Sequence, residues 1–214
     1  QTAQRMSNLF YDSLPIEIPV SLQIISFTEA KQEVQKIQEI YNVLFVSGTE
    51  DPGVYGIPFI PLQDIITTTN LDLVSTKLSG YLNEDNLKQL IINVRRNFTL
   101  MNILNYLTIL NPKPLLDATT AAIDTLQARR KVNLEGRTLV AIYIHVCILI
   151  ERLVTKTSVL QNDNATDEFI KNHQDFIQDI HASFKNIESH YSIVIPDSEM
   201  KYIYSFFEHE GETK

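Results

Sequence analysis

Hydrophobic positions in the first third of the chain alternate between helical and strand-like spacing. Residues 3–13 carry apolar side chains at helical spacing (Ala3, Met6, Leu9 and Phe10), which predicts a helix. Residues 20–27, VSLQIISF, predict a strand, residues 28–40 return to helical spacing, and residues 41–49 form a second β-branched run. The order helix, strand, helix, strand indicates a small parallel α/β unit.

A parallel unit of this kind normally opens with a strand, because its first helix packs against a sheet. No such strand precedes residue 3. We therefore expect the chain to start partway through a domain, so that its α/β unit is truncated. The alternative is that residues 3–13 form a free extension at the N-terminus.

The pattern becomes purely helical in the second part of the chain. We expect residues 1–68 to form the α/β unit, residues 69–84 to be a turn-rich linker and residues 85–214 to be an all-α bundle of five helices. The five helices are expected at residues 85–110, 115–131, 134–156, 168–191 and 198–210.

Composition restricts the classes of function. The chain has 214 residues, 44% of them hydrophobic, and a formal charge of -8 without any cluster of basic residues, so we expect no direct contact with nucleic acid. Its single cysteine, Cys147, excludes an internal disulfide and a multi-cysteine zinc site, and favours a cytoplasmic protein. No membrane segment, cofactor or enzymatic activity is predicted.

One histidine stands in the middle of the most apolar helix. Arg137, Ala141, His145, Leu149 and Arg152 are spaced so that they share one stripe of that helix. A neutral imidazole is a nucleophile near neutral pH, and arginines pair well with phosphate, so the stripe suits a phosphoryl acceptor. In an apolar helix, a single histidine is more often a hydrogen-bonded core side chain, and the two arginines could equally have stems on the core and charged ends in water.

Three segments of the second part resemble a PTS regulation domain, the helical module by which bacterial regulators sense the sugar phosphotransferase system. They read YLTILNPKPLLDATTAAIDTLQARR, LEGRTLVAIYIHVCILIERLVTK and FIKNHQDFIQDIHASFKNIESHYSIVIPDSEMKYIYSFF. In that family, a histidine followed seven residues later by arginine is phosphorylated by the phosphocarrier HPr or an enzyme IIB. The resemblance implies that His145 is the phosphorylated residue and that Arg152, with Arg137, contacts the phosphate.

The last helix departs from the family pattern. Many such modules carry a second histidine there, but EMKYIYSFF supplies Glu199 and Tyr202 and then Phe206 at the aligned position. We therefore expect a single phosphohistidine in this module.

The first third of the chain indicates which class of regulator the resemblance points to. TAQRMSNLF is similar to the first helix of an enzyme IIB-like domain, and YNVLFVSGTEDPGVYGIPFIPLQDII is similar to a segment of levanase-regulator-type activators, which act with σ54. The resemblance implies the C-terminal portion of such an activator, a homodimer controlling sugar-utilisation operons. The alternatives are a helical dimerisation scaffold that is never phosphorylated and a remnant enzyme IIB-like phosphotransferase.

Other candidate sites have weaker support. His173 and His181 could share a helix face, but no third metal ligand lies at a close spacing. The stretch SGTEDPG lacks the lysine and the spacing of a nucleotide-binding loop. Cys147 is expected to be a core residue.

Overall fold

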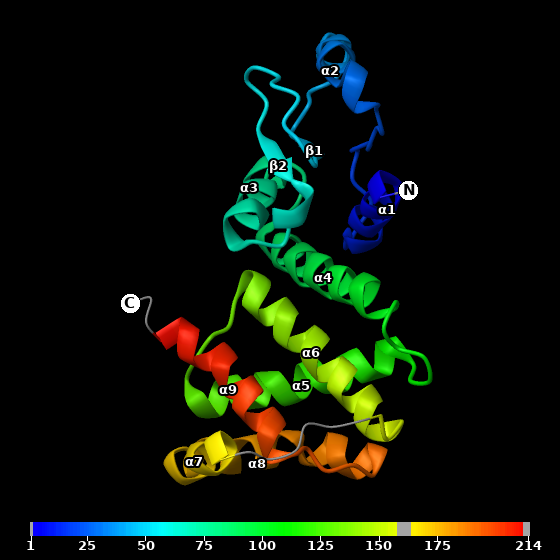
Figure 1. Cartoon of the computed structure of the whole chain (residues 1–214). Coiled ribbons are helices and arrows are strands. Elements are labelled where there is room, and N and C mark those ends of the chain that lie inside the picture. Colours follow the sequence, from blue (N-terminus) through cyan, green and yellow to red (C-terminus); the bar gives the residue numbers. More distant parts are fainter. Residues whose placement is uncertain (1, 158–163, 212–214) are drawn as a thin grey trace. The chain divides into compact units, whose positions relative to one another are not determined.

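The computed structural model describes residues 2–157 and 164–211, which divide into two compact units, residues 1–98 and 99–214 (Figure 1). The division falls within α4 (Glu84–Ile103). Among the described residues, no helix has both the length and the apolar character needed to cross a bilayer.

The first unit begins with the helix that the sequence predicts. α1 (Thr2–Ser13) buries Met6, Leu9 and Phe10, while the side chain of Ala3 lies outside the described residues. A short 3-10 turn, η1 (Phe27–Glu29), leads into α2 (Ala30–Gln38), which buries Ala30 and Val34 as its helical spacing predicts. Both predicted helices of this unit are therefore confirmed.

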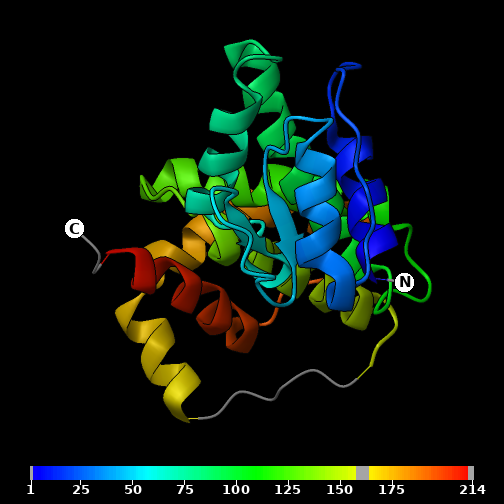
Figure 2. The same ribbon diagram turned by 90° about the horizontal axis from the view of Figure 1, so that it is seen from above.

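The sheet of this unit is parallel, as expected, but one of its strands is not the one predicted. β1 (Val46–Gly48) lies within the second β-branched run and pairs in parallel with β2 (Phe59–Pro61), Val46 opposite Phe59. Residues 20–26 form neither helix nor strand and run between α1 and α2 (Figure 2). The predicted strand at 20–27 is wrong because β-branched residues make a strand only where a neighbouring backbone pairs with them.

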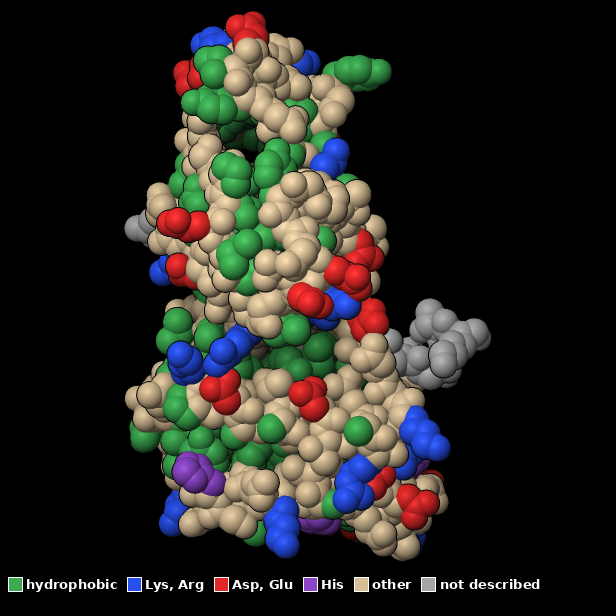
Figure 3. Space-filling view, turned by 180° about the vertical axis from the view of Figure 1, so that it is seen from behind, with side chains coloured by type: hydrophobic (Ala, Val, Ile, Leu, Met, Phe, Trp, Pro, Cys, Tyr) green, Lys and Arg blue, Asp and Glu red, His purple; other side chains and the backbone are tan. Residues whose placement is uncertain are grey.

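These elements surround an apolar cavity of about 380 Å³. Its walls come from α1, residues 19–25, α2 and residues 41–47, together with Leu62, Ile65, Leu78 and Tyr81. On the face seen in Figure 3, hydrophobic side chains lie among polar ones. In the upper part of this view, hydrophobic side chains line a hollow.

The segment expected to be a linker is largely helical. After the 3-10 turn η2 (Leu62–Asp64), α3 (Thr68–Leu78) buries Leu71, Val74 and Leu78. α4 follows after a short turn and ends at Ile103, whereas the sequence predicted a helix to residue 110; residues 104–110 form a loop. The limits of 69–84 for a linker and 85–214 for the family domain stay predictions.

The second unit contains five complete helices in its described part: α5 (Pro112–Arg130), α6 (Gly136–Val154), α7 (Asn164–Asn172), α8 (Gln174–Tyr191) and α9 (Asp197–Gly211). They are not the expected five, because the helix predicted at 168–191 is two helices separated at His173, whose backbone (φ -128°, ψ 36°) leaves the helical region. The predicted five-helix arrangement is therefore not confirmed, although the all-helical character is.

One hydrophobic core joins these helices. Its fully buried members include Ile123 and Leu126 of α5, Ile150 of α6, Phe184 of α8 and Ile203 of α9. α5 packs against α6 and α8, and α9 packs against α6, α7 and α8 (Figure 1). Because α6 and α9 share this core, polar residues on their facing sides are brought together.

Candidate functional site

The helix α6 places His145 at the border between core and solvent. The helix begins at Gly136, whose φ of 51° lies in the left-handed region that glycine adopts without strain. Val146, Cys147 and Ile150 are fully buried, whereas the His145 side chain keeps 28% of its exposure. His145 is thus neither enclosed in the core nor fully open to water.

A buried carboxylate of α9 faces two of the three residues that the sequence predicted for the site, His145 and Arg152. Glu199 Oε2 lies 3.5 Å from His145 Nε2, and Glu199 Oε1 lies 3.8 Å from Nη1 of Arg152. The Glu199 side chain is 1% exposed, so its charge is poorly screened by water. The structure therefore brings His145 and Arg152 together around one acidic group.

Two atoms of this cluster lack hydrogen bonds. Among the described residues, His145 Nε2 and Glu199 Oε1 are buried without a hydrogen-bond partner, because 3.5 Å and 3.8 Å exceed the ordinary hydrogen-bond length. Most buried polar atoms are paired, and an exception often marks a functional site. The Glu199 carboxylate thus lies at ion-pair distance from His145 and Arg152, but no close hydrogen bond joins these atoms.

Two aromatic rings from α9 flank the imidazole. The ring centroids of Tyr202 and Phe206 lie 6.3 Å and 6.0 Å from that of His145. Phe206 occupies the position where the family resemblance places a second histidine. That position is therefore close to His145 in space, although it is far away in sequence.

The predicted stripe on α6 is only partly open. Ala141 is exposed but Leu149 is buried, so the stripe does not form one continuous surface. Arg137, the second residue of α6, is exposed and lies about 12 Å along the helix axis from His145. Its contact with a phosphate stays a prediction.

A second buried carboxylate, that of Glu151 on α6, binds the loop that precedes α5. Glu151 Oε1 accepts hydrogen bonds from the backbone and hydroxyl of Thr108, both 2.7 Å, and from the Ile109 backbone at 2.9 Å. Its Oε2 accepts from the Leu110 backbone at 3.0 Å. Burial alone would raise the pKa of Glu151, but these hydrogen bonds outweigh it and hold the pKa below its usual value.

Cys147 is a core residue, as expected. It is fully buried, and its Sγ lies 3.5 Å from the hydroxyl of Thr119. Burial raises the pKa of the thiol to about 11. A thiol with this pKa is a poor nucleophile.

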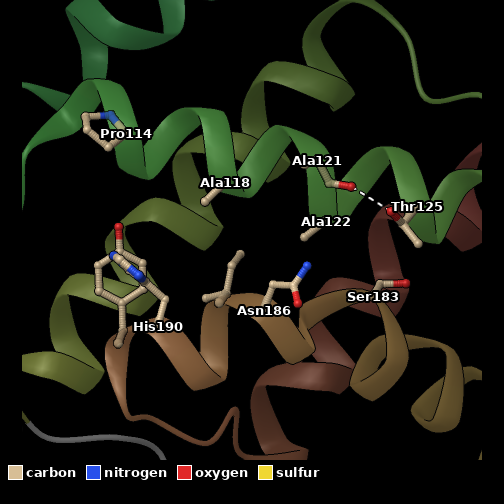
Figure 4. A pocket seen from close by; sticks show the side chains of 10 residues that line it. Pro114, Ala118, Ala121, Ala122, Thr125, Ser183, Asn186 and His190 are labelled. Carbon is tan, nitrogen blue, oxygen red and sulfur yellow. Dashed lines mark hydrogen bonds between the residues drawn. The ribbon is translucent and has the colours of Figure 1, made fainter.

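A cavity of about 450 Å³ lies between α5 and α8 (Figure 4). Pro114, Ala118 and Ala122 line it from α5, and Asn186 and His190 line it from α8. Its walls include no lysine or arginine, so it offers no permanently charged cation to a phosphate. We assign it no part in the site around His145.

The other two histidines considered from the sequence, His173 and His181, have different surroundings. His173 stacks between aromatic rings, 4.7 Å from Phe169 and 4.3 Å from Tyr204 by ring centroids, while His181 is exposed on α8. In the part of the chain that the structure describes, no three histidine, cysteine, aspartate or glutamate residues form a metal-binding group.

Sequence reasoning did not find the roles of Glu199 and Glu151. Glu199 entered only as part of a family pattern, and nothing local indicated that it would face His145 across α6 and α9. Glu151 is an acidic residue inside an apolar helix, which is a signal in itself, because a buried carboxylate requires partners.

Comparisons with known proteins bear on this site. Residues 120–210 match the family model described as PRD domain, and this range contains His145, Arg152 and Glu199. The chain is 24% identical over 189 residues to transcriptional regulatory protein DagR of Salmonella typhimurium, covering 85% of this chain and 20% of that protein. It is 21% identical over 201 residues to transcriptional regulatory protein LevR of Bacillus subtilis, covering 91% and 20%.

The chain thus spans about a fifth of the length of these curated relatives. No solved structure matches it. Residues 120–210 are therefore similar to a PRD domain, and most of the chain is similar to a part of two transcriptional regulatory proteins. The enzyme IIB-like character of the first third stays a prediction.

Proposed function

We propose that this chain is a regulatory, non-enzymatic part of a bacterial transcriptional activator in which His145 receives a phosphoryl group from a phosphotransferase-system protein. The donor is HPr or an enzyme IIB, and the modification controls a sugar-utilisation operon. The observation that carries the proposal is the partly exposed His145 next to Arg152, inside the residues that match the PRD domain.

The surroundings of His145 suit this chemistry. The acceptor ring must be reachable by the active site of the donor, and 28% exposure of the side chain provides access from one side. Arg152, with a third of its side chain exposed, lies 3.8 Å from the carboxylate that also faces His145 and presents a guanidinium to an incoming phosphate.

Phosphorylation would change the charge balance between α6 and α9. The phosphoryl group adds a charge of about -1.5 to -2 near neutral pH, next to the buried carboxylate of Glu199. Arg152 then has two anions to pair with, and repulsion between them favours a change in the packing of α6 against α9. A coupling of about 1–3 kcal/mol is sufficient to shift a regulatory equilibrium, such as that of a homodimer.

The proposal also covers the second phosphate contact, the oligomeric state and the contact with DNA. Arg137 is the second phosphate-contacting residue, the protein acts with σ54 in the cytoplasm as a homodimer, and DNA is contacted by other parts of the activator. The low basic content of this chain, 18 Lys and Arg against 26 Asp and Glu, supports the last point.

The test is phosphorylation in vitro. The chain is incubated with phosphoenolpyruvate, enzyme I and HPr, with and without a mannose-class enzyme IIB, and its intact mass is measured. We expect one acid-labile phosphoryl group on the unaltered chain and on His181→Ala, whose histidine is exposed on α8. His145→Ala should take up none while keeping its helical circular dichroism.

Uptake that persists in folded His145→Ala would refute the assignment of the site. If no donor transfers phosphate to the unaltered chain, the dimerisation scaffold becomes the better interpretation. In that case His145→Ala should lower the free energy of unfolding without any effect of phosphoenolpyruvate.

A further inference from the structure

The two nitrogens of His145 are in different surroundings. Nε2 is buried and points to Glu199 Oε2 at 3.5 Å. The side chain nevertheless keeps 28% of its exposure, so its exposed area belongs to atoms other than Nε2. Of the two nitrogens, only Nδ1 remains to be reached by a partner.

We propose that Glu199 holds His145 with its proton on Nε2 and thereby makes Nδ1 the atom that accepts the phosphoryl group. This inference rests on the proposed function and assigns Glu199 a role as a positioning residue. A buried carboxylate selects the tautomer of an imidazole 3.5 Å away by its charge, because it repels a nitrogen lone pair and attracts an N–H, so the nitrogen that faces it carries the proton.

The same carboxylate supports the transfer itself. The lone pair of Nδ1 attacks the phosphorus of the donor, and the bond between phosphorus and the donor atom breaks, with its electron pair returning to the donor side chain. The product is a phosphoimidazolium that keeps its Nε2 proton. Its positive ring charge develops next to the Glu199 carboxylate, which stabilises it in a poorly screened environment.

The neighbouring side chains keep this geometry in place. Arg152 lies 3.8 Å from the other oxygen of Glu199, so the carboxylate faces a positive charge of α6 on that side. The rings of Tyr202 and Phe206, both from α9, lie beside the imidazole, with centroids 6.3 Å and 6.0 Å away. Turning Nε2 toward the donor would leave the buried carboxylate facing a carbon atom, which is unfavourable.

The first measurement is the tautomer of His145 in the unphosphorylated chain. Long-range nitrogen–proton NMR spectra of the neutral ring at high pH distinguish a proton on Nε2 from one on Nδ1. We expect only the Nε2–H form in the unaltered chain. A proton on Nδ1 would overturn the role of Glu199 whether or not the protein is ever phosphorylated.

The second measurement is the position of the phosphate after transfer from HPr or enzyme IIB, read from phosphorus–proton couplings to the ring. Free phosphohistidine is more stable as the Nε2 isomer, so phosphate on Nδ1 is a discriminating result. Phosphate on Nε2 would overturn this inference and leave the proposed function standing. Absence of phosphate with every donor would overturn the proposed function and the acceptor assignment together.

The variant Glu199→Gln separates positioning from packing. Glutamine keeps the volume of the side chain but can also donate a hydrogen bond to the ring. We expect a mixture of tautomers, both phosphate isomers, and a transfer rate reduced by roughly tenfold, since residues that orient a reactive ring contribute at least this much.

Glu151→Gln is the matched control, because Glu151 is also a buried carboxylate of this unit but binds the loop at 108–110. In that variant, His145 should keep its single tautomer and its single phosphate isomer. If Glu199→Gln folds and gives the same tautomer and isomer as the unaltered chain, Glu199 has only a structural role.

Discussion

At the scale of single residues, the two buried carboxylates of the second unit differ in how their charge is stabilised. Glu151 accepts four hydrogen bonds from three consecutive residues. Glu199 is less exposed but faces His145 and Arg152 at ion-pair distances without a close hydrogen bond on Oε1. The first arrangement satisfies a buried charge with close hydrogen bonds, whereas the second leaves one buried carboxylate oxygen without a hydrogen-bond partner.

We expect Glu151→Gln to lower the free energy of unfolding by about 2 kcal/mol at neutral pH, because buried donors lose a charged acceptor. The pKa of Glu151 is lowered from 4.5, since hydrogen bonds outweigh the effect of burial. Its stabilisation is therefore fully present above the unfolded pKa and is lost as pH falls through the folded pKa.

Urea unfolding at neutral pH and at several acidic pH values tests this. The difference between the unaltered chain and Glu151→Gln should shrink as the solution becomes more acidic. Glu168→Gln, at an exposed position of α7, serves as the control and should change little at any pH. A difference that is constant with pH would show that the charge of Glu151 does not contribute.

Cys147 should be unreactive in the folded protein. Its pKa is raised to about 11 by burial, which lowers the thiolate fraction at mildly basic pH by about two orders of magnitude, and its sulfur has no access to solvent. A colorimetric disulfide reagent should therefore label the thiol only after urea unfolds the chain. Rapid labelling of the native protein would contradict the buried position.

At the scale of elements, the contribution of a helix cap to stability can be tested by substitution. Asn111 caps α5 by accepting a hydrogen bond from the Lys113 backbone at 3.2 Å, and Pro112 follows at the first helical position. Asn111→Ala should lower the free energy of unfolding, measured with urea, by about 1 kcal/mol. Asn186→Ala, exposed within α8, should be neutral or slightly stabilising because alanine has the higher helix propensity.

The sequence predicted the elements whose apolar spacing is long and regular. α1, α2, α5, α6 and α9 follow directly from that spacing. α3 was missed, although Leu71, Val74 and Leu78 have helical spacing, because polar and turn-forming residues surround them. β2 was missed because two prolines flank Phe59 and Ile60, and the pairing of Val46 with Phe59 is not a local property.

The candidate site shows the same limit. The position of His145 and Arg152 on one helix follows from their spacing, and their assignment came from the family resemblance. Glu199 faces them only because α9 packs against α6, and helix packing depends on contacts that local spacing does not reveal. The break between α7 and α8 at His173 was also hidden, since the apolar pattern continues across it.

At the scale of the whole molecule, the chain contains two compact units, residues 1–98 and 99–214. We expect them to lose structure in separate steps, as multi-domain chains often do. Leu78→Ala should destabilise the first unit and Phe184→Ala the second, each by about 3 kcal/mol, because both side chains are almost fully buried.

Hydrogen exchange read by mass spectrometry during urea unfolding distinguishes the units. In Leu78→Ala, peptides of residues 1–98 should lose protection at lower urea while those of the second unit keep theirs, and Phe184→Ala should show the reverse. Equal loss throughout the chain in both variants would mean that the molecule unfolds as one cooperative unit.

The loop before α5 carries exposed apolar side chains, including Leu104, Tyr106 and Ile109, yet its backbone is held by Glu151. The loop is held by main-chain atoms and the Thr108 hydroxyl, all bound to one carboxylate, rather than by its outward-facing side chains. Those positions are therefore free to vary in sequence without loss of the fold.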